Sequence, residues 1–123
     1  MNSFNETTEI IVRTHLDNAG VPSKLAGYEY IKMAVGVIME NGELMRGITK
    51  VLYPLVAREY GTTPCAVERN MRTAIDSACK KGNQYLSSMS GEGTKLHFTN
   101  SEFIFKTVNI VKMHMSFVNN DEY

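Results

Sequence analysis

One glutamate and two arginines lie close together in the segment GTTPCAVERNMR, which covers residues 61–72. If this segment is helical, Glu68 and Arg72 lie one turn apart on the same face, and Arg69 lies beside them. An arginine can donate two hydrogen bonds to O6 and N7 of guanine, and a glutamate can accept one from N4 of cytosine. The three residues therefore have the chemistry needed to read a C/G-containing DNA site in the major groove.

The alternative interpretation is a charged, solvent-exposed helix face that reads nothing. On such a face, Glu68 and Arg72 would form an i,i+4 ion pair that stabilises the helix by a few tenths of a kcal/mol. A glutamate is unfavourable for contact with bare phosphate, so its presence among the arginines favours base reading over binding by charge alone. The residues of this segment leave both interpretations open.

The residues on either side of Gly61 predict a helix-turn-helix, in which a short helix and a recognition helix meet at a steep angle around a tight turn. Ala57 is small enough for a close helix crossing, and Gly61 tolerates the positive φ that the turn requires. Asn70 lies where an apolar residue is common in this motif. Apolar residues are expected to hold the two helices together: Val56, Tyr60, Val67 and Met71. In this arrangement Pro64 and Cys65, together with the charged residues 68, 69 and 72, point outward.

Apolar residues spaced three and four apart predict an all-α chain. The expected helices cover residues 7–18, 25–40, 64–81 and 99–117, with a short helix at 83–89. Residues 44–60 leave two alternatives because of Pro54: a break near Tyr53 followed by a short helix at 54–60, or one kinked helix. Residues 90–94 are expected to form a loop, and residues 96–98 could form a single strand.

Two helix starts carry strong local signals. Thr63 is the expected N-cap of the 64–81 helix, with Pro64 at its first position. Thr99 and Glu102 match the capping box, and Phe98 and Phe103 fit the hydrophobic staple around it.

The helix that follows Thr99 has apolar residues on two stripes. One is formed by Ile104, Val108, Val111 and Met115, and the other by Phe103, Ile110 and Phe117. One stripe can serve the core, and the other needs cover from the domain or from a partner. We therefore take Ile110, Met115 and Phe117 as candidates for self-association.

The composition fits one globular domain spanning residues 1–123, with its core at about 7–117. The 123 residues carry no net charge, yet residues 46–82 hold seven basic and three acidic residues. A basic segment of this kind is typical of a local nucleic-acid footprint, although chance clustering is the alternative. Besides Thr63 and Cys65 at the start of the expected recognition helix, the candidates for DNA backbone contact are basic: Lys50, Arg58, Lys80 and Lys81.

Other classes of protein find little support. The longest apolar run, at residues 33–39, is too short to span a membrane, and the N-terminus lacks the features of a signal peptide. Free thiols at Cys65 and Cys79 fit a reducing cytoplasm, which is the expected location. The three histidines have no carboxylate or cysteine at metal-ligand spacing, and no set of nucleophile, base and orienting residue can be assembled. We expect no enzyme activity, metal, cofactor or small-molecule substrate, and no contact with a membrane.

Several segments, in order and at consistent spacing, resemble the C-terminal DNA-binding domain of the master sporulation response regulator of endospore-forming bacteria. They are GYEYIKMAV, ITKVLYPLVAREYGTT, VERNMRTAI, KKGN and TNSEFI, and the resemblance covers about residues 10–112. It implies a six-helix domain with a helix-turn-helix that binds T-G-T-C-G-A-A-like boxes in double-stranded DNA, often as tandem copies. It also implies that Glu68, Arg69 and Arg72 read bases.

The chain departs from the family's pattern at several points. Ala66 stands where a basic residue is frequent, and Thr73 where the family has a histidine, which puts affinity and site preference in doubt. We also expect no phospho-acceptor receiver domain in this chain. The second function considered is a non-catalytic interaction protein that pairs with a full-length regulator through its last helix. Retention of the acid and both arginines favours a sequence-specific transcription regulator.

Overall fold

The computed structural model of the chain describes residues 6–91 and 96–120, and all regular structure within these ranges is helical. The α-helices are α1 (Glu6–Ala19), α2 (Ala26–Glu40), α3 (Tyr53–Tyr60), α4 (Pro64–Lys81), α5 (Gln84–Ser90) and α6 (Asn100–Asn120). A 3₁₀ segment, η1 (Gly42–Gly47), and a π-helical segment, η2 (Ile48–Leu52), connect α2 to α3. The prediction of an all-α fold with six helices is confirmed.

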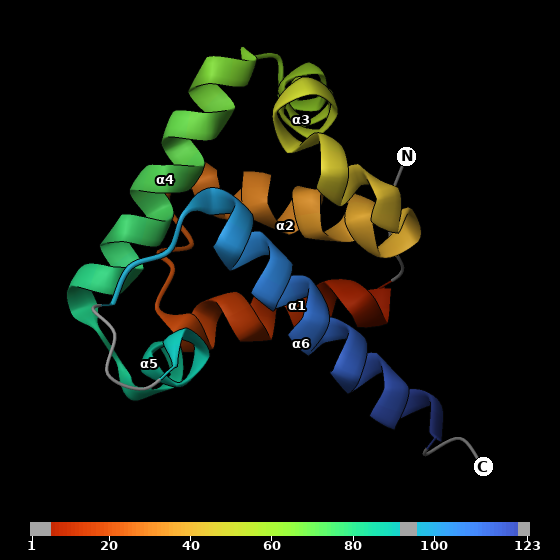
Figure 1. The fold of residues 1–123 in the computed structure, drawn as a ribbon, viewed down its shortest axis with the longest axis vertical. Coiled ribbons are helices and arrows are strands. Elements are labelled where there is room, and N and C mark those ends of the chain that lie inside the picture. The colour runs from red at the N-terminus through yellow and green to blue at the C-terminus, as the bar shows by residue number, and fades with distance from the viewer. Residues whose placement is uncertain (1–5, 92–95, 121–123) are drawn as a thin grey trace.

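Helix α2 lies at the centre of the fold. It contacts α1, α3, α4 and α6, and most of its residues are buried. Figure 1 shows α3 and α4 meeting at one end of the molecule, while α6 crosses the α1 and α2 layer and its C-terminal end extends past the other helices. The buried apolar residues form one core to which all six α-helices contribute. This core holds α3 and α4 at a fixed place on the surface.

The chain stays helical from η2 into α3, so each of the two alternatives for residues 44–60 is partly right. Helix α3 begins at Tyr53, with Pro54 in its first turn, as the shorter-helix alternative predicts. No break precedes it, because Leu52 has α-helical dihedral angles and the Tyr53 N–H bonds to the carbonyl of Ile48, five residues back. Proline has no N–H and its ring crowds the carbonyl four residues before it, and the wider π turn relieves that crowding.

The start of α6 confirms the capping box and corrects the strand. The Thr99 N–H donates to Glu102 Oε1 at 2.9 Å, and the Glu102 N–H donates to Thr99 Oγ1 at 3.1 Å. The rings of Phe98 and Phe103 meet edge to face at 5.7 Å, as the hydrophobic staple requires. Residues 96–98 do not form the strand considered for them, since no segment within the described ranges pairs with them and Phe98 is held by the staple instead. Of the expected loop, Ser90 ends α5 and residues 92–94 lie outside the described ranges.

The two stripes predicted for α6 are distributed differently in the structure. Phe103 was assigned to the second stripe, but it is fully buried beside Ile104 because α6 turns that side toward the core too. Met115 is half-buried against α1, where its sulfur accepts a hydrogen bond from the Thr8 hydroxyl at 3.7 Å. Phe117 remains exposed. Three further apolar residues of α6 are exposed, Phe105, Met113 and Val118, and Ile110 is half-buried against the core.

A buried histidine joins α1, α5 and α6. The ring of His15 is 2% exposed, with Nδ1 at 2.6 Å from the Tyr85 hydroxyl and Nε2 at 3.0 Å from the Thr107 hydroxyl. Burial lowers the pKa of His15 to about 4, and the nearby His114 adds to this effect. The native state therefore keeps the ring neutral at pH values at which an unfolded histidine is already charged.

We expect stability to fall as the pH drops from 7 to 5. His15 takes up a proton near pH 6.5 in the unfolded state and only near pH 4 in the folded state. The free energy of unfolding therefore begins to fall near pH 6.5 and levels off near pH 4. Urea unfolding at the two pH values should show a loss of about 2 kcal/mol attributable to His15. A His15→Gln variant is the control, since it lacks the titrating ring. An equal pH dependence in both proteins would contradict this assignment.

Candidate nucleic-acid interface

The turn between α3 and α4 is built as the sequence predicts. Gly61 follows α3 with φ 66° and ψ 39°, and the Thr62 N–H donates to the Ala57 carbonyl at 2.9 Å, which closes the end of the helix. Thr63 then caps α4, because its Oγ1 accepts from the Ala66 N–H at 3.1 Å. Pro64 occupies the first turn of α4. The two helices consequently meet at a sharp corner, visible where α3 and α4 join in Figure 1.

Three of the residues predicted to hold α3 and α4 together are buried, Val56, Val67 and Met71, and so is Ala57 at the crossing. Tyr60 was a wrong prediction, since it is 42% exposed and its ring lies against Tyr30 of α2 at 5.1 Å. Tyr60 is the last residue of α3, and its ring packs on α2 instead of between α3 and α4. Asn70 is tolerated in place of an apolar residue because its Nδ2 donates to the Ala66 carbonyl at 2.8 Å.

The back of α4 lies very close to α2. A Cβ atom added to Gly27 would overlap the backbone carbonyl of Asn70 and would lie 2.8 Å from the Cβ of Ala74. The two helices can approach this closely because residue 27 has no side chain. No pattern in the sequence predicted this contact. Its one signal is a glycine at the start of an otherwise well-patterned helix, and that signal does not identify the neighbour.

The outer face of α4 carries the residues whose chemistry suits base reading. Arg69 and Arg72 are exposed and Glu68 is half-buried, while Pro64 and Cys65 are exposed at the start of the helix. An Arg72 nitrogen forms an ion pair with Glu68 Oε2. The charged-face interpretation predicts this pair, and the pair lies on the same outward face that base reading requires.

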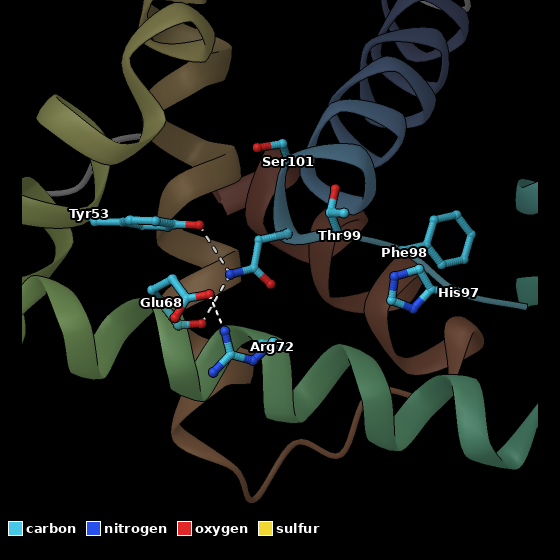
Figure 2. A pocket seen from close by; sticks show the side chains of 8 residues that line it. Tyr53, Glu68, Arg72, His97, Phe98, Thr99 and Ser101 are labelled. Carbon is cyan, nitrogen blue, oxygen red and sulfur yellow. Dashed lines mark hydrogen bonds and ion pairs between the residues drawn. The ribbon is translucent and has the colours of Figure 1, made fainter.

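An open hollow of about 330 Å³ lies between the middle of α4 and the start of α6. Figure 2 shows Glu68 and Arg72 on one side of it, Tyr53 beside Glu68, and His97, Thr99 and Ser101 across from them. Its remaining lining residues are Phe98 and Asn100. The charged pair of α4 is therefore next to the N-terminal end of another helix, an arrangement that the sequence did not predict.

Ser101 borders a second hollow, which Arg46 and Lys50 also line. The fold thereby brings Lys50, a predicted backbone-contact residue, close to the face that carries Arg72. Sequence reasoning missed Arg46 and Ser101 as members of this surface. The capping box places Ser101 at a helix start, but no local signal shows that this start lies beside α4.

The remaining predicted contact residues lie in different places. Thr63 is exposed, but its side chain caps α4, and Arg58 is exposed on α3. Lys80 and Lys81 are exposed in the last turn of α4, and Lys80 is roughly 12 Å from Arg72 along the helix axis at 1.5 Å per residue. The structure thus separates these two lysines from the hollow beside Arg72.

The described residues contain neither a metal-binding cluster nor a membrane-spanning helix. No cluster of three or more histidine, cysteine, aspartate or glutamate residues in ranges 6–91 and 96–120 is arranged to hold a metal ion. None of the helices in these ranges has the length and apolar character needed to cross a membrane.

One protein family resembles this chain over most of its length. The family model described as sporulation initiation factor Spo0A C terminal matches residues 12–111. The match includes α2, α3, α4, α5 and most of α1 and α6, so both hollows and the outer face of α4 lie within it.

Proposed function

Since the chain belongs to the family of the sporulation initiation factor Spo0A C-terminal domain, a family of DNA-binding domains, we propose that its helix α4 reads short C/G-containing boxes in the major groove. The observation that carries this proposal is the position of Glu68, Arg69 and Arg72 on the outward face of the second helix of a helix-turn-helix. Recognition helices of such motifs contact base edges from this face. The chain would then act as a sequence-specific transcription regulator.

The two arginines and the glutamate have different roles in the proposed complex. Arg69 and Arg72 each donate to O6 and N7 of a guanine, and Glu68 accepts from N4 of a cytosine. In the free protein Glu68 and Arg72 neutralise each other, but an exposed pair of this kind is worth at most about 1 kcal/mol. The base edges of G·C pairs offer acceptors to Arg72 and a donor to Glu68. DNA can therefore replace the ion pair, and each charged group keeps a hydrogen-bond partner.

Glu68, Arg69 and Arg72 form the reading face of α4, and we assign contact with the DNA backbone to the residues around it. Lys50, Arg46 and Ser101 line one hollow beside the start of α6, and Arg58 lies on α3. The N–H groups at the start of α4, at Cys65 and its neighbours, can also face a phosphate. Arginine and lysine contacts to phosphate supply affinity, whereas the base contacts supply specificity.

We expect DNA binding to weaken strongly as salt is raised. With about four to six phosphate contacts, log K should fall with log salt at a slope of about −4 to −5. Fluorescence anisotropy at several salt concentrations, on a T-G-T-C-G-A-A box duplex and on a scrambled duplex of equal length, measures this slope. Both slopes should be similar, while the box binds more tightly. A slope near zero on both duplexes contradicts a DNA-binding role.

Tandem boxes should be bound cooperatively. The exposed Phe117 of α6 offers a small apolar contact that is too weak for a free dimer but gains from the effective concentration set by adjacent sites. Shifting one box by half a helical turn should abolish the cooperativity and leave single-box affinity intact. Phe117→Ser should do the same, whereas Ile10→Ser, at an exposed apolar position of α1, should not. Unchanged cooperativity in both variants rules out Phe117 as the contact.

A further inference from the structure

The side chain of Asn100 joins three helical elements at the back of the reading face. Asn100 is the first residue of α6 and is 7% exposed. Its Nδ2 donates to the hydroxyl of Tyr53 in α3 at 3.1 Å and to the backbone carbonyl of Glu68 in α4 at 3.0 Å. Burial raises the pKa of Tyr53, so that hydroxyl keeps its proton at neutral pH. A single amide therefore ties α4 to both α3 and α6.

The carbonyl that Asn100 holds belongs to the turn that carries the charged pair. In an α-helix the carbonyl of residue 68 is also the acceptor for the N–H of residue 72. The second hydrogen bond from Asn100 thus fixes one end of the helical turn from Glu68 to Arg72. Displacing this turn would move both side chains relative to the DNA.

The oxygen of the same amide accepts no hydrogen bond from the described residues. Oδ1 of Asn100 is buried and has no partner among the described residues. A buried acceptor without a partner is costly and uncommon. Asn100 lines the hollow that Glu68 and Arg72 also line, and the Arg72 side chain is 53% exposed, so it has room to change its position. A guanidinium has five N–H donors, of which the ion pair with Glu68 requires only some.

We propose that Asn100 is a positioning residue for base reading. Its Nδ2 holds the turn at Glu68, and its Oδ1 accepts an N–H of Arg72 once the Glu68 carboxylate has bound a base. This inference rests on the proposed function. When the Glu68 carboxylate turns to a cytosine amino group, Arg72 loses its partner in the protein. Arg72 would then donate one N–H to Asn100 Oδ1 and two to a guanine, and these hydrogen bonds would hold the guanidinium plane in place. A side chain held in this way loses less freedom on binding than one that is free to rotate.

A double-mutant cycle tests the inference. Asn100→Ala, Arg72→Ala and the double variant are titrated with the box duplex and with the scrambled duplex at one salt concentration. We expect Asn100→Ala to weaken box binding about tenfold and scrambled binding less than about twofold. In the Arg72→Ala background, the same change should cost clearly less than about tenfold on the box, because only the part that acts through the Glu68 turn remains. Additive losses, or equal losses on both duplexes, would show that Asn100 serves stability alone.

Two control variants separate positioning from stability. Thr107 lies on the same helix as Asn100, about two turns further along, and bonds to the buried His15 of α1. Thr107→Ala should lower the melting temperature without changing box affinity. Tyr53→Phe removes one of the two acceptors of Nδ2 and keeps the bond to the Glu68 carbonyl, so it should weaken box binding less than Asn100→Ala. A loss of box affinity in Thr107→Ala equal to that in Asn100→Ala overturns the inference.

A spectroscopic readout avoids any change at Asn100. In the wild-type protein, saturating box DNA should shift the side-chain amide resonances of Asn100, and in Arg72→Ala it should not. Equal shifts in both proteins overturn the inference and leave the proposed function standing. A wild-type protein that binds box and scrambled duplexes equally overturns both.

Discussion

Replacing Gly27 by alanine is expected to destabilise the protein by about 3 kcal/mol, at the upper end of the cost of overpacking. The new methyl group would overlap the backbone carbonyl of Asn70 in α4, and backbone cannot rotate away as a side chain can. Accommodating it requires α2 and α4 to separate, which opens the core around Val67 and Met71. Thermal unfolding should show a melting temperature lower by roughly 10 °C.

Gly42→Ala is the matched control for this prediction. Residue 42 begins η1, its φ lies outside the left-handed region, and an added Cβ would meet no atom within 4 Å. This variant should melt within about 2 °C of the wild type, or slightly higher, because alanine restricts the unfolded chain. Equal melting temperatures for the two variants would show that α2 and α4 do not pack as closely as described.

Removing either arginine of the reading face is expected to cost about 1–3 kcal/mol on the box duplex and much less on scrambled DNA. The loss should be larger for Arg72→Ala than for Arg69→Ala. The Arg72 side chain lines the hollow beside Asn100, whose Oδ1 is proposed to hold it in the complex, so its contact with a base is the more ordered of the two. Equilibrium titration of both variants with both duplexes measures these differences.

Lys81→Ala is the control, because it also removes one positive charge from α4, but in the last turn. It should weaken binding to both duplexes slightly and equally. If Arg69→Ala and Arg72→Ala behave in the same way, their side chains contact phosphate and read no base.

Local signals in the sequence predicted the helix ends well. The capping box at Thr99, the N-cap at Thr63 and the left-handed Gly61 each depend on residues within a few positions, and the structure contains all three. The backbone path at Pro54 was harder to predict, because a proline near a helix start is compatible with a break, a kink or a wider turn. Only the surrounding fold decides among them.

Contacts between distant segments could not be predicted in this way. Gly27 meets Asn70 across 43 positions, and Asn100 meets Glu68 across 32. The interior position of His15 depends on Tyr85 and on α6 in the same manner. Each of these residues has an ordinary sequence context, so its role depends on which helix the fold places beside it.

In the candidate site and in α6, too, local spacing predicted some features, whereas others depend on how the helices pack. Helical spacing predicted that Glu68 and Arg72 share an outward face, and the structure places them there as an ion pair. Periodicity also suggested a second apolar stripe on α6 that included Phe103, yet that residue is in the core. A helix packed on more than one side buries a wider arc than a single stripe, and its sequence alone does not show how wide.

The central claim is that α4 reads individual base pairs. Its most direct test is the free-energy cost of changing each G·C pair of the box to A·T, measured for the wild type and for Arg69→Ala and Arg72→Ala. For the wild type, a change at a pair that is read should cost about 1–3 kcal/mol. At the pair read by a given arginine, the same change should cost close to nothing in the variant that lacks this arginine, while the other pairs keep their cost. If every base change costs the same in all three proteins, the arginines of α4 do not read the box.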